Sequence, residues 1–180
     1  MNNYKLIERS MKSVKDRKGC LMAYPTNNVT KTLNAYNNKI VNEKDLFVEN
    51  DDFGREKDPH VTILYGFIND LQKNELDNFF KKIHPFKIKI DGIGTFDNEK
   101  FCVLKYNIQS DVLNELNATF KKYPHVTDYP DYKPHMTIAY IKKSEEERYK
   151  SIKYPIKAEI LIDKIIYSGI NYQKIQIDLK

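Results

Sequence analysis

Two short segments of the chain are nearly identical: residues 59–65 read PHVTILY and residues 134–140 read PHMTIAY. In each, a proline precedes a histidine, and a threonine is followed by apolar residues that favour β-structure. We therefore expect each histidine at the start of a strand. Because side chains alternate between the two faces of a strand, each histidine and the threonine two positions later point the same way. The four side chains are His60, Thr62, His135 and Thr137.

The same alternation makes a prediction about the tyrosine that ends each segment. Tyr65 and Tyr140 have the opposite parity to the histidines, so we expect them to face the core. A third His-x-Thr sequence, at residues 125–127, is followed by Asp, Tyr, Pro and Asp. Proline and aspartate favour turns, so this copy is expected in a loop.

A pair of histidines with adjacent hydroxyls suits the cleavage of a phosphodiester next to a free 2′-hydroxyl. One histidine takes the hydroxyl proton, and the other protonates the leaving oxygen, because an imidazole pKa of about 6.5 makes both forms available near neutrality. Each threonine donates a hydrogen bond to a phosphate oxygen. This chemistry needs no metal, and carboxylates at metal-ligand spacing are missing near the motifs. Because the two segments are nearly equivalent, either histidine can be the base.

The order of expected elements indicates a mixed α+β domain of two lobes related by an approximate twofold, with both histidines at one central cleft. Residues 1–18 form an amphipathic leading helix, and residues 19–180 form a single domain. Helices are expected around Leu33, Leu76 and Leu116, the first capped by Thr26 or Asn27. A loop at residues 43–58 delivers the first motif strand. Other strands are expected at residues 20–24, 86–91, 101–108, 160–162, 165–168 and 175–179, with turns at residues 92–94 and 97–98.

Composition limits the partners and the compartment. The chain has 180 residues, 41% hydrophobic and 12% aromatic, which fits one globular domain. The net charge of +5 suits an anionic ligand, but no dense basic run predicts binding to double-stranded DNA. Long apolar runs and a secretory signal are missing, so no membrane association is expected. Cys20 and Cys102 form no CxxC pattern, which favours a reducing, cytoplasmic setting without zinc or disulfides.

The duplicated Pro-His-x-Thr pattern resembles the 2H phosphoesterase superfamily, which includes 2′-5′ RNA ligase-like proteins and cyclic phosphodiesterases. The resemblance spans residues 19–180, although only the two motif segments are specific. It implies a bilobal α+β fold, with two antiparallel sheets and flanking helices around a central cleft. It also implies that His60, Thr62, His135 and Thr137 act together as the catalytic groups, without a cofactor or metal.

Within that superfamily, the segments GREKDPHVTILYG and YKPHMTIAYI look most like the phage anti-CBASS nucleases. Those enzymes cut 3′-5′ linkages in cyclic di- and trinucleotides, and aromatic residues clamp the bases. The resemblance implies a cyclic oligonucleotide substrate and, for a viral protein, the host cell cytoplasm. Two aromatic residues are candidates for base stacking: Tyr24, after the first strand, and Phe96, expected in the loop after Gly94. Lys105, in a central strand, is a candidate for phosphate contact, with a solvated lysine as the alternative.

Two other functions stay open. The chain is alternatively a 2′,3′-cyclic phosphodiesterase or a 2′-5′ RNA phosphodiesterase or ligase that acts on short RNA ends. An enzyme for cyclic messengers predicts a pocket around a compact ligand, whereas an RNA enzyme predicts an open groove with a basic track. From another class, the same fold can serve as a non-catalytic nucleotide sponge or RNA-binding module. The presence of both histidines and both threonines favours an enzyme, because binding alone needs no acid–base set.

Overall fold

The structure is a computed structural model that describes residues 17–127, 131–152 and 158–180. The predicted leading helix therefore lies outside the described residues, apart from its last two positions. The strands are β1 (Gly19–Pro25), β2 (Val61–Phe67), β3 (Phe86–Asp97), β4 (Phe101–Gln109), β5 (His135–Lys142), β6 (Glu159–Ser168) and β7 (Lys174–Asp178). The helices are α1 (Asn27–Ile40), α2 (Lys73–Phe80), α3 (Asp111–Phe120) and α4 (Glu146–Lys150), with 3₁₀ turns η2 (Glu43–Asp45) and η3 (Lys143–Glu145).

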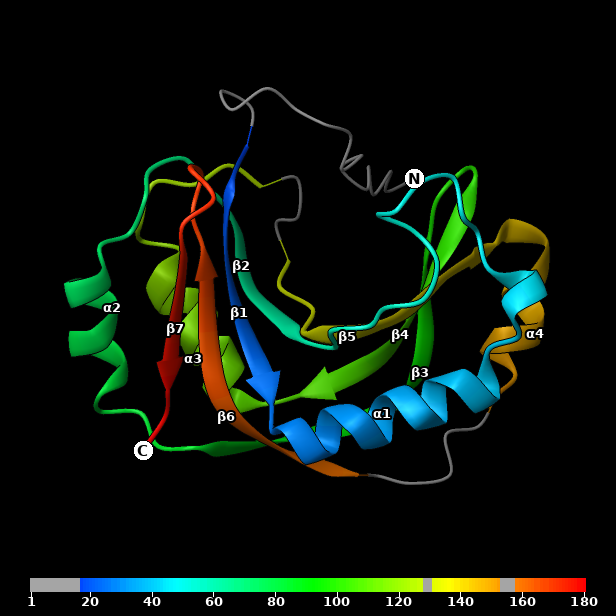
Figure 1. Cartoon of the computed structure of the whole chain (residues 1–180), viewed down its shortest axis with the longest axis horizontal. Helices are drawn as coiled ribbons and strands as arrows, with labels where there is room; N and C mark the ends of the chain where they lie inside the picture. Colours follow the sequence, from blue (N-terminus) through cyan, green and yellow to red (C-terminus); the bar gives the residue numbers. More distant parts are fainter. Residues whose placement is uncertain (1–16, 128–130, 153–157) are drawn as a thin grey trace.

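The seven strands of the described residues belong to one antiparallel sheet in the order β1-β2-β5-β4-β3-β6-β7, and β1 also pairs with β6. Figure 1 shows β7, β6, β1 and β2 together on one side of the molecule, and β5, β4 and β3 curving towards the other. The predicted α+β class is confirmed. Two sheets were expected, but the two groups of strands form one sheet, because β2 pairs with β5 and β3 pairs with β6.

The two motif strands meet at a short seam. Within the β2–β5 ladder, Val61 pairs with Met136, and each is the residue between the histidine and the threonine of its motif. Both side chains are fully buried. This antiparallel pair therefore sets the two His-x-Thr motifs side by side.

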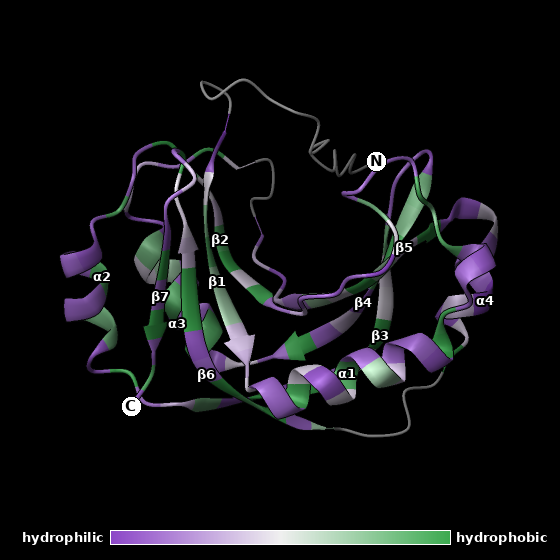
Figure 2. Ribbon diagram, viewed as in Figure 1, coloured by the Kyte–Doolittle hydropathy of each residue, from purple (hydrophilic) through white to green (hydrophobic). Residues whose placement is uncertain are grey.

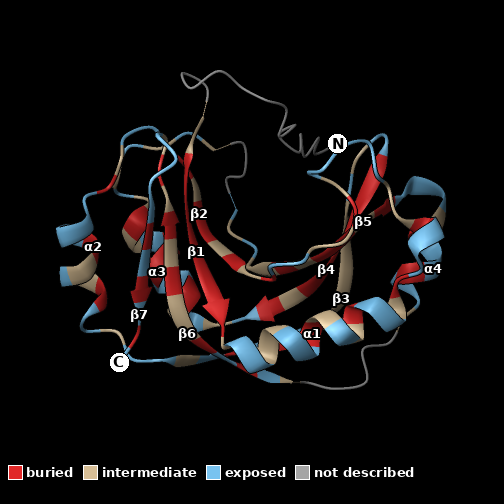
Figure 3. Ribbon diagram, in the orientation of Figure 1, coloured by how far each residue is buried: buried red, intermediate tan, exposed pale blue. Residues whose placement is uncertain are grey.

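A continuous hydrophobic core lies between the sheet and the helices. Figure 3 shows buried positions concentrated along the strands and on the inner faces of the helices, and Figure 2 shows hydrophilic residues on the outer helix faces. The amphipathic spacing predicted for the helices explains this packing. The buried helix residues include Leu33, Leu76, Phe80, Leu113, Leu116 and Phe120. No helix in the described part of the chain is long and apolar enough to cross a membrane.

Four local predictions differ from the structure in whole or in part. Residues 92–94 do not form a turn, because β3 continues through them with a β-bulge at which Gly92 has a φ of 92°. Phe96 consequently lies in β3 and not in a loop. The strands expected at residues 160–162 and 165–168 are one strand, β6. Thr26 is the N-cap of α1, but its side chain makes no capping hydrogen bond.

The end of β2 depends on the absence of a side chain at Gly66. Its φ is 109°, and a Cβ there would lie 1.9 Å from the carbonyl oxygen of Val126. Gly92 also has a positive φ, but a Cβ there would meet nothing within 4 Å. We expect Gly92→Ala to lower the free energy of unfolding by roughly 1–2 kcal/mol, and Gly66→Ala by at least about 3 kcal/mol. Urea unfolding of both variants tests this, and equal losses would contradict the steric argument.

Candidate active site

The four motif side chains line one cavity with a volume of about 260 Å³. The antiparallel Val61–Met136 pair sets their arrangement. It places His60 level with Thr137, and His135 level with Thr62. Each lobe therefore contributes one imidazole and one hydroxyl, and each imidazole lies across the seam from the hydroxyl of the other lobe.

Local backbone geometry orients both imidazoles. Nδ1 of His60 lies 2.7 Å from the carbonyl oxygen of Asp58, and Nδ1 of His135 lies 2.8 Å from that of Lys133. A carbonyl oxygen only accepts, so Nδ1 donates and Nε2 is left for proton transfer. His125 makes the same contact with Tyr123, at 2.8 Å, so this geometry is local to the Pro-His sequence. The pairing of Val61 with Met136 therefore determines which histidines lie together at the cavity.

The surroundings of His135 keep it uncharged. The ring of Phe96 packs edge-on against the imidazole with centroids 4.7 Å apart, and Nζ of Lys105 lies 4.3 Å from the centroid of Phe96. Burial, together with the charge of Lys105 and of His60, lowers the pKa of His135 to about 4. Its hydrogen bond with the backbone of Lys133 opposes this shift only in part. At neutral pH, His135 is therefore a proton acceptor.

Lys105 is not the solvated lysine of the alternative interpretation. It is 7% exposed, and its Nζ donates to Oδ1 of Asn107. Burial, with a smaller contribution from Lys133, lowers its pKa to about 8. Lys105 lines a second groove of about 570 Å³, which shares Tyr132 and Lys133 with the first cavity. A buried amine at the border of the candidate active-site cavity suits contact with an anion, and that contact remains a prediction.

Tyr24 lies against His60. The two rings are stacked with centroids 5.2 Å apart and an interplanar angle of 28°. Tyr24 is buried, and this burial together with the charge of Asp58 raises the pKa of its phenol. The stack holds the imidazole of His60 in place. Base stacking by Tyr24, and by Phe96, which lines the cavity, stays a prediction.

Each motif strand contains a β-bulge directly after its threonine. In β2, Thr62 and Leu64 pair with consecutive residues of β1, so Ile63 is an extra residue. In β5, Ile138 is an extra residue in the same way relative to β4. An extra residue reverses the alternation of all side chains that follow it.

The bulges turn the terminal tyrosines onto the face that carries the histidines and threonines. Tyr65 pairs with Cys20 of β1, and Tyr140 pairs with Val103 of β4. All four of these residues line the cavity. The prediction that both tyrosines face the core is therefore wrong, because strict alternation assumes a strand without bulges.

Hydrogen bonds from outside the motifs hold the bulges. The side-chain amide of Asn117, on α3, donates to the carbonyl oxygen of Ile63 at 2.7 Å. The backbone N–H of Glu56 donates to the carbonyl oxygen of Ile138 at 3.0 Å. In addition, the hydroxyl of Tyr132 donates to the carbonyl oxygen of Thr62 at 3.0 Å. The sequence analysis missed Asn117 and Tyr132. Both bond to backbone carbonyl oxygens, and the motif sequences do not show which side chains will reach those oxygens.

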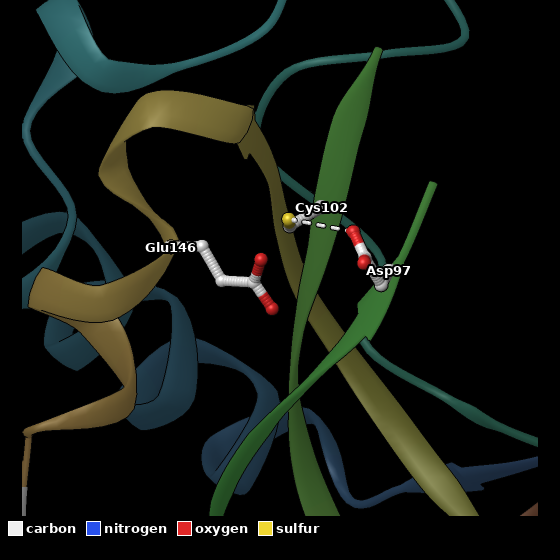
Figure 4. Close-up of side chains that lie close together, drawn as sticks. All are labelled: Asp97, Cys102 and Glu146. Atoms are coloured by element: carbon white, nitrogen blue, oxygen red, sulfur yellow. Dashed lines mark hydrogen bonds between the residues drawn. The ribbon is translucent and has the colours of Figure 1, made fainter. Parts of the chain in front are cut away.

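A second cluster, Asp97, Cys102 and Glu146, brings three potential metal ligands within 4.8 Å of one another (Figure 4). Lys143 bonds to both carboxylates, and Lys150 lies 2.7 Å from Glu146. Burial raises the pKa of Glu146, but the bonds to these lysines outweigh it and lower the pKa to about 2. Burial raises the pKa of the Cys102 thiol to about 12. The cluster is therefore an ion-pair network that holds α4 against β3, with a protonated thiol that is a poor ligand.

The sequence matches a known protein family. The pattern of the 2′-5′ RNA ligase superfamily matches residues 45–165, which include both His-x-Thr motifs. No curated protein matches the sequence.

Several solved structures share the fold. Usb1 of Kluyveromyces marxianus has a TM-score of 0.59 and 12% identity, covering 93% of this chain and 100% of that protein. LigT of E. coli, solved with 3′-AMP, has a TM-score of 0.53 and 11% identity, covering 91% and 95%. TT0787 of Thermus thermophilus has a TM-score of 0.53 and 14% identity, covering 91% and 95%. These likenesses support the α+β fold with a large antiparallel sheet and flanking helices.

The electrostatics of His135 can be measured without any substrate. We expect its imidazole to titrate near pH 4 in an NMR pH titration, and Lys105→Met to move the midpoint to higher pH, because a neighbouring charge is lost. Lys87→Met is the matched control, since Lys87 is exposed and pairs with Glu159. A midpoint near 6.5, unchanged in Lys105→Met, would contradict this description of the site.

Proposed function

The chain belongs to the 2′-5′ RNA ligase superfamily of 2H phosphoesterases, and we propose that it cleaves 3′-5′ linkages of cyclic oligonucleotide immune signals without a metal. The observation that carries the proposal is the meeting of both His-x-Thr motifs at one cavity. Family membership makes the chain a phosphodiester-cleaving enzyme. The cyclic substrate, and with it a counter-defence role in the host cell cytoplasm, is the finer proposal.

The two histidines divide the proton transfers. His135, neutral at physiological pH, takes the proton of the 2′-hydroxyl through Nε2. The hydroxyl oxygen attacks the adjacent phosphorus, and the bond from phosphorus to the leaving 5′-oxygen breaks. The role of general acid then falls to His60, which protonates that oxygen from the other side of the seam. The products are a 2′,3′-cyclic phosphate and a 5′-hydroxyl.

The threonines stabilise the negative charge of the phosphate. Thr62 and Thr137 lie on opposite sides of the seam and both line the cavity. Their hydroxyls donate to the two non-bridging oxygens, whose negative charge grows as the nucleophile attacks. Lys105, close to His135, adds a positive charge at the border of the site.

The composition of the cavity favours a compact ligand. Within the described chain, the lysines and carboxylates that line it are Lys121, Lys133, Glu56 and Asp131. Two lysines balanced by two carboxylates make no basic track for a long RNA backbone. A small ring with few phosphates fits this balance better.

The second candidate is a 2′,3′-cyclic phosphodiesterase or a 2′-5′ RNA phosphodiesterase or ligase. It is favoured by the names of the family and of the neighbours, among them LigT solved with 3′-AMP and Usb1 solved with uridine monophosphate. The same four side chains can catalyse these alternative reactions, because the reactions use the same acid–base chemistry. A non-catalytic sponge is disfavoured by the uncharged, oriented His135.

Removal of either histidine should abolish most of the activity. We expect His60→Ala and His135→Ala each to lower kcat by at least about 10²-fold, and Thr62→Val and Thr137→Val to cost less. His125→Ala is the matched control, because His125 has the same backbone contact but does not line the cavity. The assay is chromatography of cyclic di- and trinucleotides incubated with protein and EDTA.

Each outcome of that assay separates the candidates. Linear products from wild type, and not from the His60→Ala/His135→Ala variant, support the proposal. Turnover of 2′,3′-cyclic phosphates or 2′-5′ oligonucleotides alone supports the second candidate. Intact ligand that is recovered only after denaturation supports the sponge, and full activity in both single histidine variants contradicts the mechanism.

The pH profile should reflect the unusual base. A base must be deprotonated to act, so kcat/KM should stay high down to about pH 5 and fall as the pH drops through about 4. On the alkaline side, Lys105 loses its charge as the pH rises through about 8, so KM should rise there. Lys105→Met should remove this rise in KM. An acid limb near pH 6.5 in the wild type would contradict the assignment of His135 as base.

A further inference from the structure

The last strand of the sheet, β7, has an edge that faces away from its neighbour. In the sheet order β7 stands at the end, next to β6, and no described strand pairs with its other edge. Figure 1 shows β7 at the margin of the strands on its side of the molecule, beside α2. An open edge is a template for pairing with another strand, unless the sequence protects it. The backbone and side chains of β7 therefore determine what this edge can bind.

The register with β6 shows which backbone groups of β7 point outwards. The N–H of Leu179 donates to the carbonyl oxygen of Asp163, and these two residues continue the register of the ladder. Because hydrogen-bonded pairs alternate along an antiparallel ladder, the odd-numbered residues of β7 bond to β6. The N–H and C=O groups of Lys174, Gln176 and Asp178 consequently point to the open edge.

The side chains of the strand divide in the same way. Ile175 and Ile177 are buried in the core, on the face of the sheet where α2 contacts β7. The side chains of Lys174, Gln176 and Asp178 are exposed on the opposite face. They form a row with a positive charge at one end, an uncharged amide in the middle and a negative charge at the other end.

This row is complementary to a second copy of itself. In an antiparallel pairing centred on Gln176, Lys174 of each copy lies opposite Asp178 of the other, and all three outward residues exchange backbone hydrogen bonds. A pairing centred on Lys174 or on Asp178 would oppose two like charges, and a parallel pairing in register would do so at both ends. Opposite charges directly across a strand pair stabilise it, and like charges destabilise it. The charges of the row therefore favour one arrangement.

We propose that β7 is the contact of a symmetric homodimer, in which two copies of the chain join their sheets edge to edge about a twofold axis at Gln176. The partner is a second copy because the charged row is its own complement. Such an isologous contact closes on itself and does not extend into a filament. The apolar side chains of β7 are already covered within each copy, so backbone bonds and charge pairs supply the attraction. We expect a dimer that dissociates in the micromolar range and weakens at high salt.

Sedimentation equilibrium measures the dimer directly and does not depend on the proposed cleavage activity. Lys174→Asp sets carboxylates opposite carboxylates, and Asp178→Lys sets lysines opposite lysines, so each should weaken dimerisation by about tenfold or more. The double variant Lys174→Asp/Asp178→Lys restores opposite charges and should dimerise as wild type does. Lys31→Asp is the matched control, because it makes the same charge change at an exposed position on α1.

An equimolar mixture of the two single variants gives a sharper test. The row of Lys174→Asp is wholly acidic and that of Asp178→Lys is wholly basic, so the mixture should form a heterodimer although each variant alone is mainly monomeric. Gln176→Pro tests the backbone separately. It removes an N–H that points to the open edge and not to β6, so the fold should be kept while pairing at the axis is lost. Circular dichroism of each variant checks the fold.

Three results would overturn the inference. The first is a wild type that stays monomeric up to about 1 mM. The second is a dimer that the charge variants and Gln176→Pro leave unchanged, which would place the contact on another surface. The third is a loss of dimer in the single variants that neither the double variant nor the mixture restores, since this would show that the opposed charges do not set the pairing.

Discussion

The pairing of Val61 with Met136 is the contact on which the site depends. These are the middle residues of two motifs that lie far apart in the sequence, and their pairing is the β2–β5 ladder. Antiparallel geometry at this point sets each imidazole level with the hydroxyl of the opposite lobe. A parallel pairing, or a shift by one residue, would separate the histidines or turn one motif to the core. The two groups of strands are also joined away from this pair, where β3 pairs with β6.

The site is symmetric in its backbone and asymmetric in its charge. Both motifs have the same histidine–carbonyl contact and the same bulge after the threonine. Their surroundings differ, because Tyr24 stacks on His60, while Phe96 and Lys105 lie beside His135. A duplicated motif therefore provides the geometry, and the neighbouring strands give the two histidines different surroundings. Both β1 and β4, which carry Tyr24 and Lys105, are neighbours of the motif strands.

Polar side chains from outside the motifs support the strand face that carries the candidate residues. Asn117 on α3 reaches the bulge of β2, and Tyr132 bonds to the carbonyl oxygen of Thr62. An unpaired carbonyl in this position would cost about 1–3 kcal/mol, so these donors stabilise the irregular strand as well as the fold. The helices thus do more than cover the sheet, since α3 also holds the strand that carries Thr62 and Tyr65.

The sequence alone determined the α+β class, most helices and strands, and the four catalytic candidates. It could do so because hydrophobic periodicity and the repeated His-x-Thr spacing are local properties of the chain. Only the tertiary structure decided the bulges at Ile63 and Ile138, which reverse the facing of the tyrosines, because a bulge is defined relative to a neighbouring strand. The lowered pKa of His135 was also beyond the sequence. It arises from Lys105 and from burial, which depend on how strands distant in the chain are brought together.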